Sequence, residues 1–297
     1  MSDIDRKLSL VFPLFLFSVL IIFFTESCAN TKTVLQTGSV PADFVPVRHL
    51  VFIGLDGWGG VYVPDANMPT VKRMMSYGAW SLDTRGVLPV TSWPNWTSLF
   101  CGAPPEQRNR EDFPSIFTLV KNNEQTKKPA LFYEWNDLRE ICPDETAEKQ
   151  EIFSDLESAR KVAAYITEKK PVFTAVMFNE PDLTGHAKRW GSAAYYAKLT
   201  EMDGLIAVIE QAVKDAGIYD STVFVLSADH GGSFYGHGGN SSRQRKIPLI
   251  IYGSGIKEGF VIYSPVNIYD ITPTMAALLG MDIPSEWTGR LLYEIFK

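Results

Sequence analysis

The segment "HLVFIGLDG", His49–Gly57, decides the expected fold. Its first part, His49–Leu55, is an apolar run of the kind that forms a strand buried on both faces of a parallel sheet. Asp56 follows this strand directly. Four later segments have the same strand-like character: 129–135, 171–178, 221–228 and 247–253.

Helical patterns alternate with these strands along the chain. The alternation predicts right-handed crossovers and an α/β fold, a doubly wound, mostly parallel sheet with helices on both faces. Such folds bind their ligands beyond the carboxyl ends of the strands, so we expect the chemistry there. The expected helices are 68–77, 115–121, 155–169, about 193–216 and 268–279.

The composition is that of a globular protein with one sizeable core. The chain has 297 residues, of which 45% are hydrophobic, and its net charge is −6. Since no basic cluster would release the counterions that drive binding to a phosphate backbone, we expect no nucleic-acid partner. An anionic substrate must then be held by local charge, most simply by a metal ion.

The N-terminus has the plan of an export signal. Arg6 and Lys7 precede the apolar run Leu8–Phe24, and the short segment "TESCAN" follows it. We therefore expect an exported protein of a bacterium, either periplasmic or attached to the cell surface, whose only membrane contact is through this N-terminal signal or anchor.

The domain organisation follows from this signal. We expect residues 1–29 to be the export signal, 30–46 a linker and 47–297 one catalytic domain. Cys28 is a candidate for lipid attachment, while cleavage after Ala29 or an uncleaved membrane anchor are the alternatives.

The two remaining cysteines, Cys101 and Cys142, are too few for a disulfide framework. They either pair with each other or stay as two buried thiols.

Three of the predicted strands end in metal-ligand residue types. Asp56 follows the first, Asp182 lies a few residues past 171–178, and Asp229 stands next to His230 after 221–228. His186 lies four residues after Asp182, a spacing that lets both side chains face one point if this segment makes a helical turn.

A glycine-rich loop after His230, "GGSFYGHGG", adds His237. Three of the four histidines of the chain therefore belong to these segments, and His49, at the start of a strand, is given no role. The candidate ligands are three carboxylates and three imidazoles: Asp56, Asp182, His186, Asp229, His230 and His237.

Six such ligands suit two ions better than one. Two ions with three protein ligands each keep open positions for substrate, which is the catalytic pattern. Oxygen and nitrogen ligands without thiolate favour Zn²⁺, with Mn²⁺ or Fe as alternatives. Because neighbouring residues of a strand point to opposite sides, Asp229 and His230 could serve different ions. Paired ions stabilise the attacking and leaving oxygens of a displacement at phosphorus.

The segment "VTSWPNW" offers two hydroxyls, Thr91 and Ser92, before an expected helix from about Pro94. A hydroxyl needs a base or a metal ion to become a nucleophile, and a helix start directs N–H groups toward a phosphate. The alternative is an N-cap followed by a proline in the first turn. With six ligand-type side chains elsewhere, we favour a nucleophile.

As a set, these segments resemble the alkaline phosphatase superfamily, and within it the type I phosphodiesterase and nucleotide pyrophosphatase branch. The resemblance extends from Arg48 to the C-terminus. The motifs that carry it, in the order of the family, are "GLDG", "TSWPNW", "PDLTGH", "ADHGG" and "GHGG".

The resemblance implies how the ligands divide. One ion would be bound by Asp182, His186 and His237, and the other by Asp56, Asp229, His230 and the oxygen of Ser92. The nucleophile of the family stands two residues before the proline, which selects Ser92, with Thr91 as the alternative. Ser92 would form a covalent phosphoserine that water then hydrolyses.

The sequence departs from the family pattern after Gln107. Relatives continue with His-Gly and a later asparagine that helps to hold a phosphate oxygen, whereas this chain has "RNREDFPS". Asn109 is the candidate for that asparagine, and Arg108 or Arg110 could supply charge instead. Trp58 and Trp93 could stack on a base or pack at the sheet edge.

The expected function is hydrolysis of a small phosphate ester, most closely that of a phosphodiesterase or nucleotide pyrophosphatase. A phosphomonoesterase, a sulfatase and a non-catalytic metal-binding surface lipoprotein are the alternatives. Sulfatases carry Cys/Ser-x-Pro-x-Arg, and the position of the arginine is held here by Trp96, which disfavours a sulfate ester. The natural leaving group and the oligomeric state stay open.

Overall fold

The computed structural model describes residues 39–108, 113–123, 129–142 and 147–297. These belong to one compact unit, Gly38–Lys297. The expected export signal with Cys28, and the candidate phosphate contact Asn109, lie outside the described residues. Within the described ranges, no helix has both the length and the apolar character that a membrane crossing requires.

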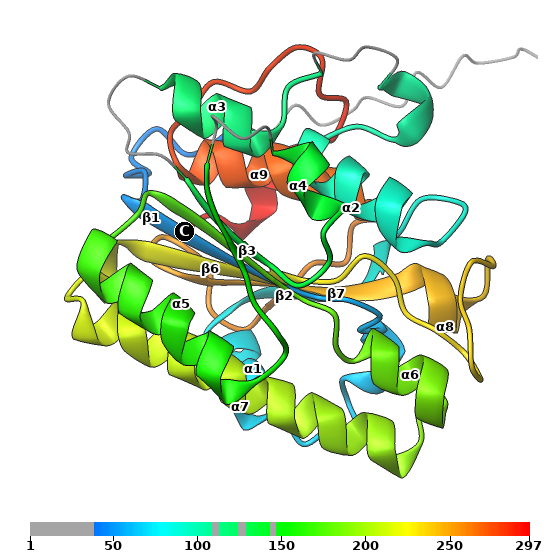
Figure 1. Ribbon diagram of the computed structural model, residues 1–297. Coiled ribbons are helices and arrows are strands. Elements are labelled where there is room, and N and C mark those ends of the chain that lie inside the picture. The colour runs from blue at the N-terminus through cyan, green and yellow to red at the C-terminus, as the bar shows by residue number, and fades with distance from the viewer. Residues whose placement is uncertain (1–38, 109–112, 124–128, 143–146) are drawn as a thin grey trace, which may run out of the picture. The chain divides into compact units, whose positions relative to one another are not determined.

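The described residues form an eight-stranded sheet in the order β4-β3-β5-β1-β6-β7-β2-β8 (Figure 1). All neighbouring strands are parallel except at β7, which runs antiparallel to β6 and β2. The strands are β1 (His49–Leu55), β2 (Gly78–Arg85), β3 (Ala130–Tyr133), β4 (Glu148–Glu151), β5 (Phe173–Phe178), β6 (Thr222–Ser227), β7 (Lys246–Gly253) and β8 (Phe260–Val261).

This topology confirms the predicted α/β fold with a mostly parallel sheet. The direction of β7 differs from the fully parallel arrangement implied by its apolar sequence. Between β6 and β7 the described chain contains only one short helix, α8 (Ser242–Arg245), too little for the crossover that a parallel strand would need. The chain therefore turns back along β6.

Three strands, β2, β4 and β8, were absent from the prediction. β4 has the sequence "EKQE" and β8 has only two residues, so neither carries an apolar pattern. Both lie at the edges of the sheet, where a strand is paired on one side only.

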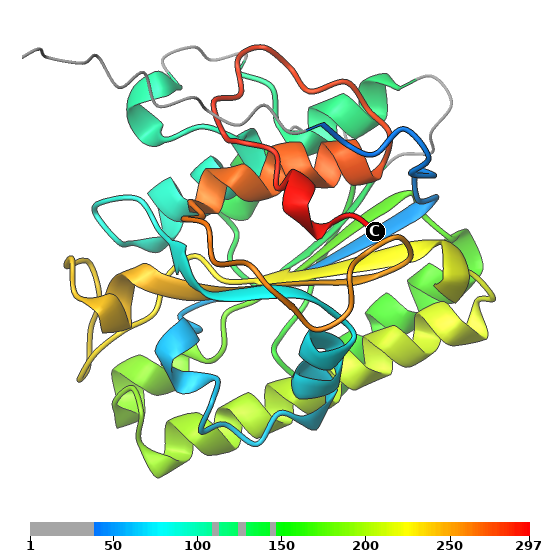
Figure 2. The same cartoon turned by 180° about the vertical axis from the view of Figure 1, so that it is seen from behind.

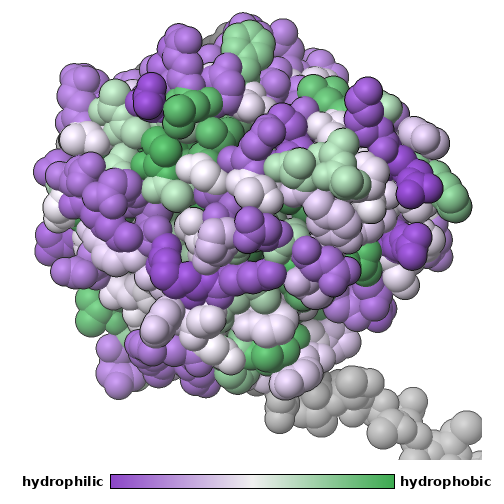
Figure 3. Space-filling model, turned by 90° about the horizontal axis from the view of Figure 1, so that it is seen from below, coloured by the Kyte–Doolittle hydropathy of each residue, from purple (hydrophilic) through white to green (hydrophobic). Residues whose placement is uncertain are grey.

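Helices cover both faces of the sheet, as Figures 1 and 2 show. One face carries α2 (Ser92–Cys101), α3 (Ile116–Asn122), α4 (Leu138–Ile141) and α9 (Ile271–Leu278), and the other carries α1 (Pro69–Ser76), α5 (Leu156–Lys169) and α7 (Ala193–Asp215). Seen from the side of α5 and α7, hydrophilic side chains predominate and apolar ones form small groups (Figure 3).

Packing onto the central strand β1 positions α2. Phe52 of β1 makes edge-on ring contacts with Trp96 and Phe100 of α2, and all three side chains are buried. Burying each such side chain contributes about 1.5–3 kcal/mol, so this interface holds the helix firmly against the sheet. The first residue of α2, Ser92, thereby lies near the carboxyl end of β1.

The described end of the expected linker packs against the body of the domain. The ring of Phe44 lies 4.7 Å from that of Phe296, and the N–H of Val47 donates to the carbonyl of Leu278. Of the two alternatives for the cysteines, the structure has the second, since Cys101 and Cys142 are both buried and no disulfide joins them.

Candidate active site and metal centre

Three adjacent strands deliver the three carboxylates to one place. β5, β1 and β6 are parallel neighbours, so their carboxyl ends meet at the same edge of the sheet. Asp56 follows β1, Asp229 follows β6, and Asp182 begins α6 (Asp182–Lys188) after β5. The strand ends singled out in the sequence are thus brought together by the strand order.

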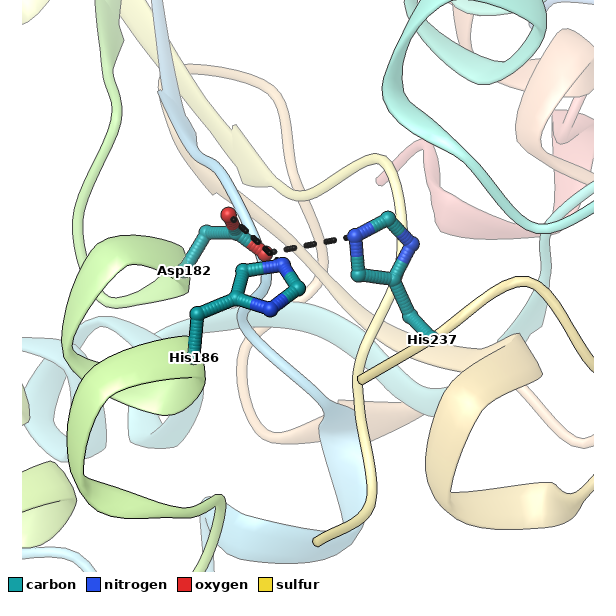
Figure 4. Close-up of side chains that lie close together, drawn as sticks. All are labelled: Asp182, His186 and His237. Atoms are coloured by element: carbon teal, nitrogen blue, oxygen red, sulfur yellow. Dashed lines mark ion pairs between the residues drawn. The ribbon is translucent and has the colours of Figure 1, made fainter. Parts of the chain in front are cut away.

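The first cluster consists of Asp182, His186 and His237, whose side chains point toward one another (Figure 4). His186 lies one turn after Asp182 on α6, and its Nε2 is 3.5 Å from Oδ2 of Asp182. Nε2 of His237, from the loop after β6, is 3.8 Å from Oδ1 of Asp182. The predicted helical turn is therefore present, and these three residues form a candidate metal-binding group.

Gly57 makes the position of Asp182 possible. Its φ of +72° is in the left-handed region, and a Cβ atom there would lie 2.7 Å from the Cα of Asp182. A larger residue would push α6 away from the end of β1.

The second cluster forms around Nε2 of His230. This atom lies 3.2 Å from Oδ2 of Asp229, 3.5 Å from Oδ1 of Asp56 and 3.2 Å from Oγ of Ser92. Asp182 can also offer an oxygen within 4.8 Å of ligand atoms of Asp56 and His230, so it faces both clusters.

The side chains of Asp229 and His230 converge on one point, which corrects the expectation from strand alternation. β6 ends at Ser227, so both residues lie in the following loop, where the alternation of an extended strand no longer applies. The arrangement has instead the grouping that the family resemblance implies.

The three site histidines are oriented in the same way. Nδ1 of each lies 2.9 Å from a backbone carbonyl: His186 from Tyr235, His230 from Gly231 and His237 from Val90. Because a carbonyl only accepts, the proton belongs on Nδ1, and the lone pair of Nε2 faces the carboxylates. This is how proteins orient histidine as a metal ligand.

The carboxylates supply the strongest test of whether cations fit here. Asp56 Oδ1, Asp182 Oδ1 and Asp229 Oδ2 are buried and have no hydrogen-bond partner among the described residues. Two other oxygens are occupied: Asp229 Oδ1 accepts from the N–H groups of Gly57 and His230, and Asp56 Oδ2 accepts from the indole N–H of Trp96. A buried carboxylate oxygen without a donor is costly, and a divalent cation between these oxygens and the Nε2 atoms would satisfy it.

The pKa values of the site residues also indicate that cations fit here. Burial, and then the neighbouring Asp229 and Asp182 carboxylates, raise the pKa of Asp56 well above its usual value. Burial, and then Asp182, raise the pKa of Asp229 to about 8. Burial lowers the pKa of His230 well below its usual value, with a further contribution from His237. The site therefore lacks positive charge, which two divalent ions would supply.

Ser92 is the hydroxyl that faces this site. It is the first residue of α2, and the preceding Thr91 is the N-cap, whose side chain makes no capping hydrogen bond. The free N–H groups of the first helical turn lie beside the Ser92 hydroxyl and would favour an anionic ligand.

The contact of Ser92 with His230 differs from that of a serine protease triad. In a triad the histidine bonds a carboxylate through Nδ1 and the serine through Nε2. Here Nδ1 of His230 bonds the carbonyl of Gly231, while Nε2 faces Ser92 together with the Asp56 and Asp229 carboxylates. This is the arrangement of a metal ligand.

Two supporting residues were missed in the sequence. The buried indole N–H of Trp96 donates to Oδ2 of Asp56 at 3.2 Å and orients that carboxylate. Asn95 accepts from the N–H of Val87 at 2.7 Å and donates to the carbonyl of Thr91 at 2.9 Å, which fixes the loop before Ser92. The Pro-Asn pair was visible in the sequence, but these contacts were not.

Three other candidates lie away from the site or pack within the protein. Trp58 is fully buried and therefore cannot stack on a base. Trp93 is 40% exposed, and its ring packs edge-on against that of Trp135. Arg108 lies beside Cys101 at the far end of α2, about 14 Å along the helix from Ser92, so it does not supply charge to the site.

Two family models match different parts of the chain. Residues 119–281 match the model of the sulfatase family, and residues 50–108 match that of type I phosphodiesterase / nucleotide pyrophosphatase. Asp56 and Ser92 thus fall in the phosphodiesterase match, and the five later ligands fall in the sulfatase match.

Curated relatives come from three branches. GPI ethanolamine phosphate transferase 1 of Emericella nidulans is 23% identical, over 97% of this chain and 38% of the relative. Ectonucleotide pyrophosphatase/phosphodiesterase family member 1 of Mus musculus is 22% identical, over 81% of this chain and 29% of the relative. Arylsulfatase K of Danio rerio is 34% identical, over 35% of this chain and 21% of the relative. The chain therefore spans well under half the length of these relatives.

Solved structures with the same fold come from the same branches. Human ectonucleotide pyrophosphatase/phosphodiesterase 5 has a TM-score of 0.70 at 12% identity, covering 84% of this chain and 100% of that chain. The phosphonate monoester hydrolase of Silicibacter pomeroyi has a TM-score of 0.66 at 18% identity, covering 82% of this chain and 75% of that chain. At these identities the likeness establishes the fold alone.

Proposed function

The chain belongs to the sulfatase family of the alkaline phosphatase superfamily. We propose that it is a metal-dependent hydrolase of phosphate diesters with Ser92 as its nucleophile. The observation that carries the proposal is the position of the Ser92 hydroxyl, 3.2 Å from Nε2 of His230, among carboxylate oxygens that have no hydrogen-bond partner in the described part of the chain.

The residues fit two divalent ions, most simply Zn²⁺. Asp182, His186 and His237 would hold one, and Asp56, Asp229, His230 and Ser92 the other. Bound there, the ions would lower the pKa of the attacking oxygen and neutralise charge on the phosphoryl group.

Ser92 would act in two steps. Its Oγ attacks phosphorus, the bond from phosphorus to the leaving alcohol oxygen breaks, and the alcohol departs with a proton. Water then attacks the phosphoserine, the bond from phosphorus to Oγ breaks, and a phosphate monoester leaves with the serine hydroxyl restored. The N–H groups at the start of α2 would stabilise the phosphoryl oxygens in both steps.

The segment that holds Ser92 favours phosphate over sulfate. This part of the chain matches the phosphodiesterase model, and Trp96 occupies the place of the sulfatase arginine. The indole of Trp96 is buried and bonds Asp56, so this side chain supports a ligand and leaves the substrate without an arginine from this position.

Three chromogenic substrates test the proposal. We expect p-nitrophenol release from bis-p-nitrophenyl phosphate to exceed that from p-nitrophenyl phosphate and p-nitrophenyl sulfate, and to depend on added zinc. A preference for the monoester would make the protein a phosphatase, and a preference for the sulfate would make it a sulfatase. No turnover of any of them by a metal-loaded sample would overturn the enzyme proposal.

Transfer to an alcohol is a second candidate, because the ethanolamine phosphate transferase aligns with nearly the whole chain. The phosphoserine step would be the same, with an acceptor hydroxyl in place of water. With p-nitrophenyl phosphoethanolamine as donor and glycerol as acceptor, a transferase would form glycerophosphoethanolamine, whereas a hydrolase would release free phosphoethanolamine.

A further inference from the structure

Two cations face each other across paired strands near the active site. Arg85, the last residue of β2, is in register with Lys246, the first residue of β7. Like charges directly opposite on neighbouring strands destabilise the pair. Asp83 pairs with Lys246 at 3.0 Å, whereas no carboxylate in the described part of the chain lies within ion-pair distance of Arg85.

A third cation, Arg245, is fixed beside this pair. Its Nε donates to the carbonyl of Gly86 at 3.0 Å, and its Nη1 donates to Oδ1 of Asn240 at 3.0 Å. These two bonds hold the guanidinium in place, and its remaining N–H groups have no acceptor among the described residues. A guanidinium held in this way is ready to bind an oxyanion without further ordering.

These cations line a pocket of 170 Å³, which we call the basic pocket. Its lining residues are Arg85, Asn240, Ser242, Arg245 and Lys246, and no carboxylate is among them. The volume is several times the roughly 30 Å³ share of one water molecule, so an oxyanion with some of its hydration fits. A cluster of three cations is notable on a chain whose net charge is −6.

The basic pocket lies at the same edge of the sheet as the candidate metal centre. β7 is the neighbour of β6, and β2 is the next strand, so the pocket is about 5–10 Å along the edge from the end of β6. Gly86 connects the two places, since a Cβ atom there would lie 3.2 Å from the backbone oxygen of Asp229. Gly86 also begins the loop that leads to Ser92.

We propose that the basic pocket binds a second tetrahedral oxyanion, a phosphate or a sulfate, that the substrate carries beside the ester group cleaved at Ser92. The proposal rests on the proposed function for the reaction at Ser92. It limits the substrate class to molecules with at least two anionic groups. It also explains why Arg85 and Lys246 face each other, since a bound anion would relieve the repulsion between these two cations.

A matched pair of substrates tests the substrate class. Thymidine 5′-(p-nitrophenyl phosphate) has one anionic group, and its 3′-phosphorylated form has a second. Because a charge-assisted hydrogen bond contributes enough for about tenfold in affinity, we expect the 3′-phosphate to lower KM about tenfold or more. Arg85→Gln and Arg245→Gln should each remove most of this difference, and Arg85→Gln, whose side chain does not hold the loop before Ser92, should leave KM for the plain diester unchanged.

Arg160→Gln is the matched control, since Arg160 is an exposed arginine on α5. It should keep the preference of the wild type. Equal KM values for the two substrates in the wild type, or a preference that survives in Arg85→Gln and Arg245→Gln, would overturn the proposal.

Binding of inorganic phosphate and of sulfate tests the pocket without catalysis. Calorimetric titration of the chelator-treated full chain should give one site in the wild type and in Arg160→Gln, and none in Arg245→Gln. The anion that binds with the higher affinity indicates whether the second group of the substrate is a phosphate or a sulfate. If the anion binds at this site but no ester is turned over, the result supports the proposed anion site and contradicts the proposed hydrolase activity. If esters are turned over but no anion binds, the result overturns the proposed anion site alone.

Thermal unfolding separates a ligand site from a structural role. If the pair of Arg85 and Lys246 repels in the absence of ligand, Arg85→Gln should keep or raise the melting temperature. A clear fall would show that Arg85 stabilises the fold, and would contradict the proposal.

Discussion

Oγ of Ser92 lies 3.2 Å from Nε2 of His230, although 138 positions separate the two residues in the chain. The strand order explains the contact, because β1 is the neighbour of β6 and α2 packs on β1 through Phe52. A hydroxyl at a helix start thereby reaches an imidazole at a strand end. The same imidazole faces Asp56 and Asp229, so the hydroxyl belongs to a group of ligands.

Ser92→Ala should remove turnover and keep the metal. Loss of the attacking oxygen is expected to lower kcat by about 10³-fold or more, since no other described group replaces a nucleophile. Thr91→Ala is the matched control and should keep most of the activity. If Thr91→Ala is the inactive variant and Ser92→Ala is active, the neighbouring hydroxyl is the nucleophile.

Asp182→Ala and His237→Ala should each lower the bound metal from two ions toward one per chain. Both residues belong to the first cluster, and a site left with two ligands binds weakly. Metal content after dialysis, measured by inorganic mass spectrometry, gives the count. His49→Gln, which changes a histidine at the other end of β1, should leave two ions. Two ions at full occupancy in Asp182→Ala would contradict the ligand division.

Trp96→Phe should weaken metal binding through an indirect effect. The substitution keeps a ring in the core but removes the N–H that holds Oδ2 of Asp56. Loss of such a supporting bond lowers metal affinity by about 10- to 100-fold. Trp93→Phe, on the exposed side of the same helix, is the control. Equal zinc affinity of Trp96→Phe and the wild type in a competition titration would argue against this role.

The contribution of Asp229 to the stability of the metal-free protein should fall as the pH rises from about 4 to about 8. The fold raises the pKa of Asp229 from 3.8 to about 8, so the folded state holds a proton that the unfolded state releases. The stability from this group is complete below about pH 4 and is lost as the pH rises through 8, with a slope of up to about 1.4 kcal/mol per pH unit.

Asp229→Asn isolates this effect, because an amide does not titrate. In chelator, the free energy of unfolding of Asp229→Asn should fall less with pH than that of the wild type, and added zinc should reverse the trend in the wild type. Parallel pH profiles of the two proteins would contradict the assignment of this group.

Much of the site could be predicted from the sequence, because its ligands follow apolar strands directly. Asp56, Asp182 and Asp229 mark three strand ends, and parallel strands bring such ends to one edge. The prediction needed only the strand pattern and the rule of alternation with helices. The choice of Ser92 over Thr91 depends instead on the family resemblance, which implies a nucleophile two residues before the proline.

Other features depend on contacts that no local pattern reveals. The bond from Trp96 to Asp56 joins residues 40 positions apart, and a buried tryptophan in a helix is indistinguishable from ordinary core in the sequence. The opposition of Arg85 and Lys246 depends on β2, a strand that was not predicted, and on the antiparallel direction of β7. The net charge of −6 therefore gave no sign of the basic pocket, whose residues come together only in the fold.

The position of the covalent phosphoryl group tests the central claim most directly. A metal-loaded sample turning over bis-p-nitrophenyl phosphate would be quenched in acid, digested, and its peptides sequenced by tandem mass spectrometry. We predict a phosphoryl ester on Ser92, absent from Ser92→Ala. A modified Thr91, or steady turnover with no modified residue in Val90–Trp96, would contradict the account.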